Sequence, residues 1–312
     1  MRPQSERKII LVWRRSRLDE VISRYNTHEQ ARFQMECMDR DFRDLEQEDR
    51  IYKAELDQVE TDLRRLARVQ RLERSFLSNF LFGPDDVVVV MGQDGLVANT
   101  MKYLQGQPLI AINPDPGRIQ GVLLPFSSRQ AVAVAKATLE GCSSVQEITM
   151  AEALTSDGQR LLAVNDFFIG MRGHTSARYH IQCDGRQEYQ SSSGVIVSTG
   201  LGSSGWMRSV IMGASGICKA AGIKLPRESL LADVRWDARE LFFYVREPFP
   251  GRSAEVDIVF GRIHKGAKLS LISDMADRGI LFSDGMEDDC LAFSAGMGLK
   301  IGVADQKGSL VI

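Results

Sequence analysis

The sequence predicts an N-terminal α/β domain with a parallel sheet, followed by a β-rich, sandwich-like domain. Two runs, Asp85–Met91 with its four consecutive valines and Pro108–Asn113, show no polar alternation, which is typical of strands that helices cover on both faces. After about residue 139, short apolar runs alternate with turns. Asp184-Gly185 and Asp284-Gly285 lie between such runs, and this is a strong hairpin signal. The 312 residues are enough for two domains.

Strands and helices alternate in the first domain. Lys8–Trp13 is expected to be a strand, and Thr27–Gln30 has the capping-box pattern that opens a helix. From Asp41 to about Arg68 the sequence is highly charged, with apolar residues in steps of four and three, which favours a surface helix with one buried stripe. A coiled-coil partner site is the alternative, but two heptads are fewer than the ~3–4 that a zipper needs. We expect this domain to span residues 1–125, with residues 41–68 as a helical insertion.

The second domain is expected to span residues 126–312. A helix is predicted near Arg129–Leu139 and another near Ser204–Ala221. The remaining apolar runs predict strands at 160–164, 177–183, 194–198, 241–245, 254–260, 267–273 and 279–282. Whether the last segment returns to the first domain is left open.

Composition narrows the class of protein. A formal net charge of −2 gives no reason to expect nucleic acid or an anionic membrane as a partner. No apolar run approaches the ~18 residues of a membrane span. The five cysteines are scattered and never in C-x-x-C spacing, and the four histidines show no metal-ligand spacing. This pattern suits a reducing cytoplasm and predicts no metal site held by a protein motif.

The loop Gly200-Leu-Gly202-Ser-Ser-Gly205 matches the G-x-G-x-x-G pattern of dinucleotide-binding folds. A Rossmann fold places this motif in its first strand–helix turn, with an acidic residue ~20 positions later at the end of the next strand. Here Glu228 is the nearest acidic candidate, with no clear strand before it, and the loop lies inside the β-rich half. The pattern alone therefore favours a tight strand-to-helix turn over a Rossmann site.

A second glycine loop, Gly92-Gln93-Asp94-Gly95, follows the run Asp85–Met91. Glycines let a backbone approach phosphate oxygens and donate N–H groups to them. An aspartate in such a loop makes chemical sense if it takes a proton from an attacking hydroxyl, or holds phosphate-bound Mg²⁺. An ordinary turn aspartate is the alternative, and this loop alone favours it. The Walker pattern is absent, and Gly261–Lys268, which comes near it, is interpreted as a hairpin turn.

Several blocks occur together in a characteristic order. Asn165-Asp166 is followed by Ser198–Trp206 and then by Leu281-Phe-Ser-Asp-Gly285. With the Gly92–Gly95 loop, this set resembles the NAD kinase superfamily, which includes the diacylglycerol, sphingosine and 6-phosphofructo kinases. The similarity extends over residues from about 85 to 290. It points in particular to the mitochondrial-type NAD kinases and their bacterial relatives, which also carry a helical insertion and share runs such as those at 110–117, 168–170, 176–178 and 192–194.

The resemblance implies roles for individual residues. Asp94 would be the catalytic aspartate that activates the ribose 2′-hydroxyl of NAD, with the loop residues Gly92, Gln93 and Gly95 at the phosphates. Asn99 would start the supporting helix. The adenosine half of NAD would be held by Asn165 and by Asp166, whose carboxylate accepts both hydroxyl protons of a diol; a β-turn Asn-Asp is the alternative. The dinucleotide pocket would be lined by Gly202, Ser203, Ser204, Trp206 and Ser209, whereas for Arg178 and Arg208 a surface position is favoured.

The sequence also departs from the family at two positions that bear on the phosphates. Gln93 replaces the second glycine of the motif, and Leu96 replaces a threonine or serine. Both changes affect the handling of ATP more than the binding of NAD, although Gln93 could instead donate its amide to a phosphate oxygen. Ser193 stands where many bacterial members have an aspartate, as it does in the mitochondrial-type branch.

The function predicted from the sequence is that of an NAD kinase, which phosphorylates NAD(H) to NADP(H). ATP is the expected donor, with polyphosphate as another, and Mg²⁺ would be held through the donor phosphates. Two alternatives are a kinase of the same superfamily acting on a sugar or lipid diol, and a non-catalytic NAD(P)(H)-binding protein. The resemblance implies a homodimer or homotetramer.

Overall fold

The computed structural model describes residues 7–223, 234–250 and 256–312, and the chain divides into two compact units. The first unit comprises Met1–Gln146 with Ser309–Ile312, and the second comprises Glu147–Gly308. The structure is a mixed α/β protein with one sheet that contains parallel strands and a separate antiparallel sheet. In the described part of the chain no helix is both long and apolar enough to cross a membrane.

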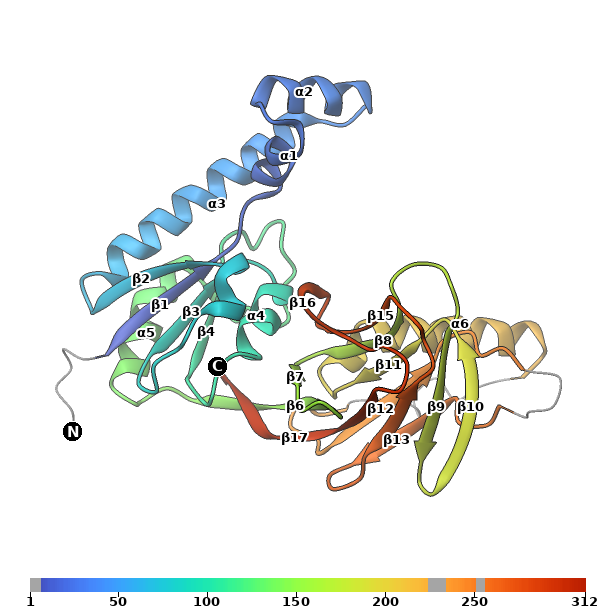
Figure 1. The fold of residues 1–312 in the computed structure, drawn as a ribbon. Coiled ribbons are helices and arrows are strands. Elements are labelled where there is room, and N and C mark those ends of the chain that lie inside the picture. Colours follow the sequence, from blue (N-terminus) through green and yellow to red (C-terminus); the bar gives the residue numbers. More distant parts are fainter. Residues whose placement is uncertain (1–6, 224–233, 251–255) are drawn as a thin grey trace. The chain divides into compact units, whose positions relative to one another are not determined.

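A parallel sheet forms the centre of the first unit (Figure 1). Its strands are β1 (Lys8–Trp13), β2 (Arg68–Glu73), β3 (Val87–Met91) and β4 (Leu109–Asn113), in the order β4-β3-β1-β2. All three pairings are parallel. Every residue of β3 and β4 is buried, as the apolar runs predicted. Because the strands run parallel, their carboxyl ends meet at one edge of the sheet. Open α/β folds bind their ligands at this edge.

Helices α3 (Phe42–Leu63) and α5 (Ala131–Leu139) cover the same face of this sheet. The apolar stripe of α3 packs with strand residues Leu11 and Val89 in one core cluster. The surface helix with a buried stripe is thus confirmed, and the partner for the stripe is the unit's own sheet. The other helix of the central region is α4 (Asp94–Met101), and the short strand β5 (Phe126–Ser127) pairs with β4.

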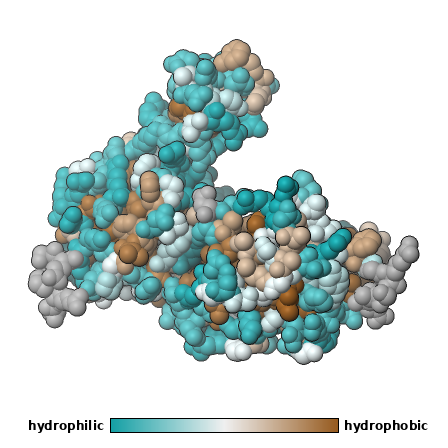
Figure 2. Space-filling view, viewed as in Figure 1, coloured by the Kyte–Doolittle hydropathy of each residue, from teal (hydrophilic) through white to brown (hydrophobic). Residues whose placement is uncertain are grey.

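The helical insertion expected at residues 41–68 is larger at its beginning and shorter at its end. Helix α3 ends at Leu63, and two shorter helices precede it and belong to the insertion, α1 (Arg17–Tyr25) and α2 (His28–Cys37). Ser16 and Asp19 form a reciprocal capping box at the start of α1. Leu18 of α1 and Met35 of α2 are buried against Phe42 at the first turn of α3, so the far end of the insertion has a small core of its own. Hydrophilic residues cover most of its visible surface (Figure 2).

Two sheets face each other in the second unit, as the sequence predicted. Within the described residues one sheet has the order β13-β12-β11-β8-β15-β16, and β10-β9-β14-β17 form the other with β6 and β7. Phe167 and Val197 of the first sheet pack with Tyr179 and Leu271 of the second in one core. The strands are β6 (Val145–Thr155), β7 (Arg160–Ala163), β8 (Asp166–Met171), β9 (Ala177–Cys183), β10 (Arg186–Ser192), β11 (Val195–Ser198), β12 (Glu240–Val245), β13 (Phe260–His264), β14 (Leu269–Ser273), β15 (Gly279–Ser283), β16 (Met286–Ala292) and β17 (Gly298–Val311).

Helix α6 (Trp206–Ala220) lies on the outer face of the antiparallel sheet. Its Met207 is buried with Phe168, Ile196 and Phe242. The strand-to-helix turn predicted at the G-x-G-x-x-G loop is therefore present, between β11 and α6.

The structure differs from the expected organisation in one detail and answers a second that the sequence left open. The boundary between the units falls after Gln146, later than expected, because α5 contributes Ala131 and Ala135 to the core of the first unit. The end of β17 returns to the first unit, where Leu310 pairs in parallel with Leu109 of β4.

The interpretation of Gly261–Lys268 as a hairpin turn was wrong, because the strands on either side do not pair: β13 pairs with β12, and β14 pairs with β9 and β17 in the other sheet. Gly261 lies inside strand β13, and the turn comes only at Gly266, which has a φ of +92°. A Cβ on Gly261 would lie 2.5 Å from the ring of Phe243, so this glycine serves close packing between strands. Of the strand expected at 254–260, residues 254–255 lie outside the described part, and only Phe260 belongs to a strand.

Candidate functional site

The Gly92–Gly95 loop lies at the carboxyl edge of the parallel sheet. Strand β3 ends at Met91 and α4 begins at Asp94, and β3 is flanked by β1 and β4. The loop thus occupies the middle of the edge at which three parallel strands end. This is the position where an α/β sheet offers a ligand both backbone N–H groups and a helix N-terminus.

Two hydrogen bonds fix the carboxylate of Asp94. Its oxygens accept the backbone N–H groups of Val122 and Leu123, each at 2.9 Å. These donors belong to the segment that follows β4, so Asp94 ties that segment to the start of α4. A carboxylate has about four lone-pair sites, and two therefore stay available for a further donor.

The residues beside Asp94 differ in what the fold requires of them. A Cβ on Gly92 would lie 3.0 Å from the side chain of the buried Leu96, whereas a Cβ on Gly95 would meet no atom within 4 Å. Packing thus accounts for Gly92, while Gly95 leaves open space next to Asp94. Gln93 has φ −119° and ψ 164°, an ordinary extended backbone, so this replacement of a glycine causes no strain.

The resemblance implied that Asn99 starts the supporting helix, and the structure shows that it does not. Helix α4 begins five residues earlier, at Asp94, and Asn99 is buried inside it. The reason is that the loop residue Gln93 is already the N-cap of α4. Among the described atoms, Asn99 Oδ1 has no hydrogen-bond partner.

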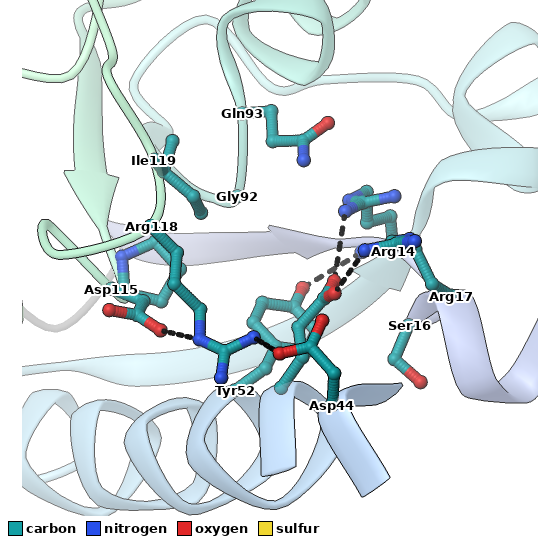
Figure 3. Close-up of a pocket in the computed structure, with 12 residues that line it drawn as sticks. Arg14, Ser16, Arg17, Asp44, Tyr52, Gly92, Gln93, Asp115, Arg118 and Ile119 are labelled. Atoms are coloured by element: carbon teal, nitrogen blue, oxygen red, sulfur yellow. Dashed lines mark hydrogen bonds and ion pairs between the residues drawn. The ribbon is translucent and has the colours of Figure 1, made fainter. Parts of the chain in front are cut away.

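A cavity of about 330 Å³ opens beside this loop (Figure 3). Its walls come from the segments after β1, β3 and β4 and from helix α3. The hydroxyl of Tyr52 in α3 donates to the Met91 carbonyl and accepts the backbone N–H of Arg14, both at 3.1 Å. Burial raises the pKa of this hydroxyl. The lining residues are Arg14, Ser16, Arg17, Asp44, Glu48, Tyr52, Gly92, Gln93, Pro114, Asp115, Arg118 and Ile119.

Sequence reasoning missed most of this cavity. Arg14 directly follows the strand Lys8–Trp13, and Arg118 follows the strand that ends at Asn113. Because the carboxyl ends of parallel strands meet at one edge, the positions of these two arginines were a usable signal. Tyr52 gave no such signal, because it belongs to the apolar stripe of α3.

In the second unit, the Asp-Gly hairpin holds the backbone of the Asn-Asp pair. The carboxylate of Asp284, at the turn between β15 and β16, accepts three backbone N–H groups. The donors are Val164 at 2.9 Å, Asn165 at 2.6 Å and Asp166 at 3.2 Å. Asp284 and Gly285 both have positive φ, at 52° and 68°. The tight turn thus places the Asp284 carboxylate within hydrogen-bonding distance of the segment 164–166, more than a hundred residues earlier in the chain.

The loop between β11 and α6 packs against the same segment. Thr199 donates its N–H to the Asn165 carbonyl at 2.9 Å and its hydroxyl to the Val164 carbonyl at 2.6 Å. A Cβ on Gly202 would lie 2.0 Å from the Asn165 carbonyl oxygen, and one on Gly200 would lie 2.3 Å from the Arg235 carbonyl oxygen. Close packing between backbones therefore accounts for these two glycines.

The remaining predicted residues lie along this loop and the start of α6. Ser203 is nearly buried and donates its hydroxyl to the Gly200 carbonyl at 2.7 Å, while Ser204 is exposed. Trp206 stacks on Phe168 with ring centroids 5.8 Å apart. The structure thus brings Ser203 and its loop to the Asn165–Asp166 backbone, whereas the remaining side chains are exposed on the surface: Arg178, Arg208 and Ser209.

Asp166 has the most perturbed carboxyl of this group. Burial, together with the nearby charge of Asp284, raises its pKa to about 7. Carboxyl groups held away from their ordinary pKa in this way are concentrated at functional sites. Glu228, the acid that a Rossmann reading required, lies outside the described residues.

Replacing Gly202 by alanine is expected to destabilise the protein severely. The new Cβ would overlap the Asn165 carbonyl, and the backbone cannot retreat without breaking the hydrogen bonds of Thr199. Overpacking of this kind costs about 1–3 kcal/mol or more, which thermal denaturation would register as a fall in melting temperature of several degrees. Gly213→Ala is the matched control, because a Cβ there meets nothing within 4 Å in helix α6. Equal melting temperatures for the two variants would contradict this account of the loop.

Comparison with known proteins identifies the type of fold. No family model matches the chain, and no curated protein matches it in sequence. Among solved structures, the chain is similar to an NAD kinase from Archaeoglobus fulgidus in complex with ATP, with a TM-score of 0.57 and 17% identity, over 98% of this chain and 93% of that chain. It is also similar to yeast NADH kinase complexed with NADH, with a TM-score of 0.55 and 12% identity, over 97% of this chain and 83% of that chain. The chain therefore has an NAD kinase-like fold, as the ordered motifs predicted.

Proposed function

We propose that the protein is an NAD kinase that transfers a phosphoryl group to the 2′-hydroxyl of the adenosine ribose of NAD(H). The observation that carries the proposal is the fixed Asp94 carboxylate at the carboxyl edge of the sheet, in a fold shared with solved kinases of NAD and NADH. Those two proteins were solved with ATP and with NADH, which supports the same two classes of substrate for this chain.

Asp94 is the general base in the proposed reaction. It takes the proton of the 2′-hydroxyl while that oxygen attacks the terminal phosphorus of the donor in line. The new bond joins this oxygen to phosphorus, and the bond from phosphorus to the bridging oxygen of the donor breaks. The N–H groups of Val122 and Leu123 orient the carboxylate and leave lone pairs for the incoming proton. Positioning and charge neutralisation supply most of the rate enhancement, as in phosphoryl transfer generally.

The acceptor is proposed to bind at the Asn165–Asp166 segment. Asn165 would pair with the adenine edge, and the Asp166 carboxylate would accept a ribose hydroxyl other than the one that Asp94 activates. The Asp284 carboxylate supports this by holding the backbone of both residues. Gly202, Ser203, Ser204, Trp206 and Ser209 are the proposed lining of the dinucleotide pocket.

The donor phosphates are proposed to bind at the loop Gly92, Gln93 and Gly95, where Gly95 leaves open space. In the described part of the chain no group of three or more His, Cys, Asp or Glu side chains is placed to hold a metal ion. A Mg²⁺ ion would be held mainly by the donor's phosphate oxygens. When bound, it would neutralise phosphate charge.

A coupled assay tests the proposal. Purified protein with NAD or NADH, ATP and Mg²⁺ is expected to form NADP or NADPH, measured with an NADP-specific dehydrogenase. Binding of NAD(H) without turnover from any nucleoside triphosphate or polyphosphate would instead favour the non-catalytic alternative. No thermal shift with NAD, together with phosphorylation of a sugar or lipid diol, would favour another acceptor.

The unstrained backbone of Gln93 supports a working variant of the loop over one that has lost turnover. A cytoplasmic location and a homodimeric or homotetrameric state remain expectations.

A further inference from the structure

The cavity beside the Gly92–Gly95 loop has a positive wall and a negative wall. On the first, two guanidinium groups share one carboxylate: Arg17 lies 3.0 Å from Glu48, and Arg14 lies 4.0 Å from it. Glu48 can neutralise only one of these charges. On the other wall the balance is reversed, because Arg118 lies between two carboxylates, 2.6 Å from Asp44 and 3.5 Å from Asp115 (Figure 3).

The backbone that carries the positive wall is tied to the loop. The Tyr52 hydroxyl accepts the backbone N–H of Arg14 and donates to the carbonyl of Met91, and Met91 directly precedes Gly92. One side chain of the insertion therefore joins the ends of β1 and β3. The side chain of Gln93 does not cap α4 and lines the same cavity, so its amide is placed to donate to an anion there.

Size and chemistry together indicate the ligand. At about 330 Å³ the cavity is near the lower end of the ~300–1,000 Å³ that small-molecule sites have, which suits a compact anion better than a whole nucleotide. Planar guanidinium groups bind phosphate oxygens through paired, charge-assisted hydrogen bonds. The opposite carboxylates can accept a cation that accompanies the phosphates.

We propose that this cavity binds the phosphate chain of the phosphoryl donor, through Arg14, Arg17 and Gln93. The inference rests on the proposed function, and it assigns a purpose to the helical insertion, since α3 supplies Tyr52 and Glu48. The donor is recognised by its phosphates, which either a nucleoside triphosphate or inorganic polyphosphate can supply.

The double variant Arg14→Gln with Arg17→Gln tests this inference in the full chain. Titration calorimetry with inorganic tripolyphosphate is expected to show at least a tenfold rise in Kd, and the KM for ATP should rise by a similar factor. The KM for NAD is expected to stay within twofold of wild type. Arg15→Gln is the matched control, since Arg15 is an exposed arginine of the same segment that does not line the cavity.

The outcomes separate the inference from the proposed function. If the double variant makes NADP with an unchanged KM for ATP, or if Arg15→Gln has an equal effect, the inference is overturned while the proposed function stands. If wild type forms no NADP from any donor, the proposed function fails, and tripolyphosphate binding still decides the inference. Absence of tripolyphosphate binding in wild type would overturn the inference.

Comparing ATP with tripolyphosphate as donors distinguishes the two sources of phosphate. If the double variant does not fold, Arg17→Gln carries the test, because 53% of the Arg17 side chain is exposed.

Discussion

The Asp94→Asn protein is expected to form NADP at least about 10³-fold more slowly than wild type, because general-base catalysis contributes about 10²–10⁴-fold. An amide cannot take the 2′-hydroxyl proton, whereas the shape and most contacts of the side chain are kept. The amide also turns an N–H donor toward Val122 or Leu123, which themselves donate to this position. The change therefore weakens the alignment of the loop as well. The measurement is the steady-state kcat for NADP formation at saturating NAD and ATP.

Asp39→Asn serves as the matched control for this experiment. Asp39 is exposed, belongs to the same unit and has a φ of 54° that asparagine tolerates. It should leave both kcat and the melting temperature unchanged. Undiminished NADP formation by a folded Asp94→Asn protein would exclude Asp94 as the base.

Replacing Asp166 by asparagine is expected to weaken NAD binding by about 10-fold to 10²-fold. One charge-assisted hydrogen bond from a ribose hydroxyl is lost, and such a bond contributes about 1.5–3 kcal/mol. The same substitution is expected to stabilise the unliganded protein at neutral and alkaline pH. The two effects have one cause, since burial penalises the carboxylate that the ligand requires.

The direction of the pH dependence follows from the raised pKa of Asp166. Because this pKa is about 7 in the folded protein and near 3.8 without the fold, the folded state binds more protons between these values. The free energy of unfolding contributed by Asp166 therefore falls as pH rises from about 4 to 7, and stays low above pH 7. The total loss is at most of the order of 4 kcal/mol.

Thermal denaturation from pH 4 to pH 8 measures this effect. The Asp166→Asn protein should melt several degrees above wild type at pH 8, and the difference should vanish toward pH 4. Asp305→Asn changes a fully exposed carboxyl of the same unit and should keep the wild-type profile. A parallel profile for wild type and Asp166→Asn would show that the half-buried carboxyl carries no such penalty.

The helices and strands that could be predicted are those whose burial produces a local pattern of apolar residues in the sequence. Strands β3 and β4 are buried on both faces, so their runs are uninterrupted. Strand β2 was missed because in its sequence, Arg-Val-Gln-Arg-Leu-Glu, only Leu72 is buried. It is an edge strand of the sheet, and half of its residues are exposed. An edge strand of this kind leaves little hydrophobic signal.

The candidate site was predictable in part for the same reason. Asp94 and Asp166 could be singled out because each stands beside a run or motif with a recognisable order, and their roles stay predictions. The part played by Asp284 was not predictable, because its carboxylate reaches a backbone N–H 119 residues away. The arginine wall of the cavity likewise depends on Tyr52, which from the sequence was only one member of an apolar stripe.

The sequence by itself determined the α/β-then-β order of the chain, the buried strands and the glycine loop with its aspartate. These follow from the burial and backbone preferences of neighbouring residues, which are local quantities. Only the tertiary structure decided why Gly202 must be glycine, which carboxylate supports Asn165, and which arginines share Glu48. Each of these depends on a contact between distant segments, and the partner in such a contact has no periodicity along the chain that could reveal it.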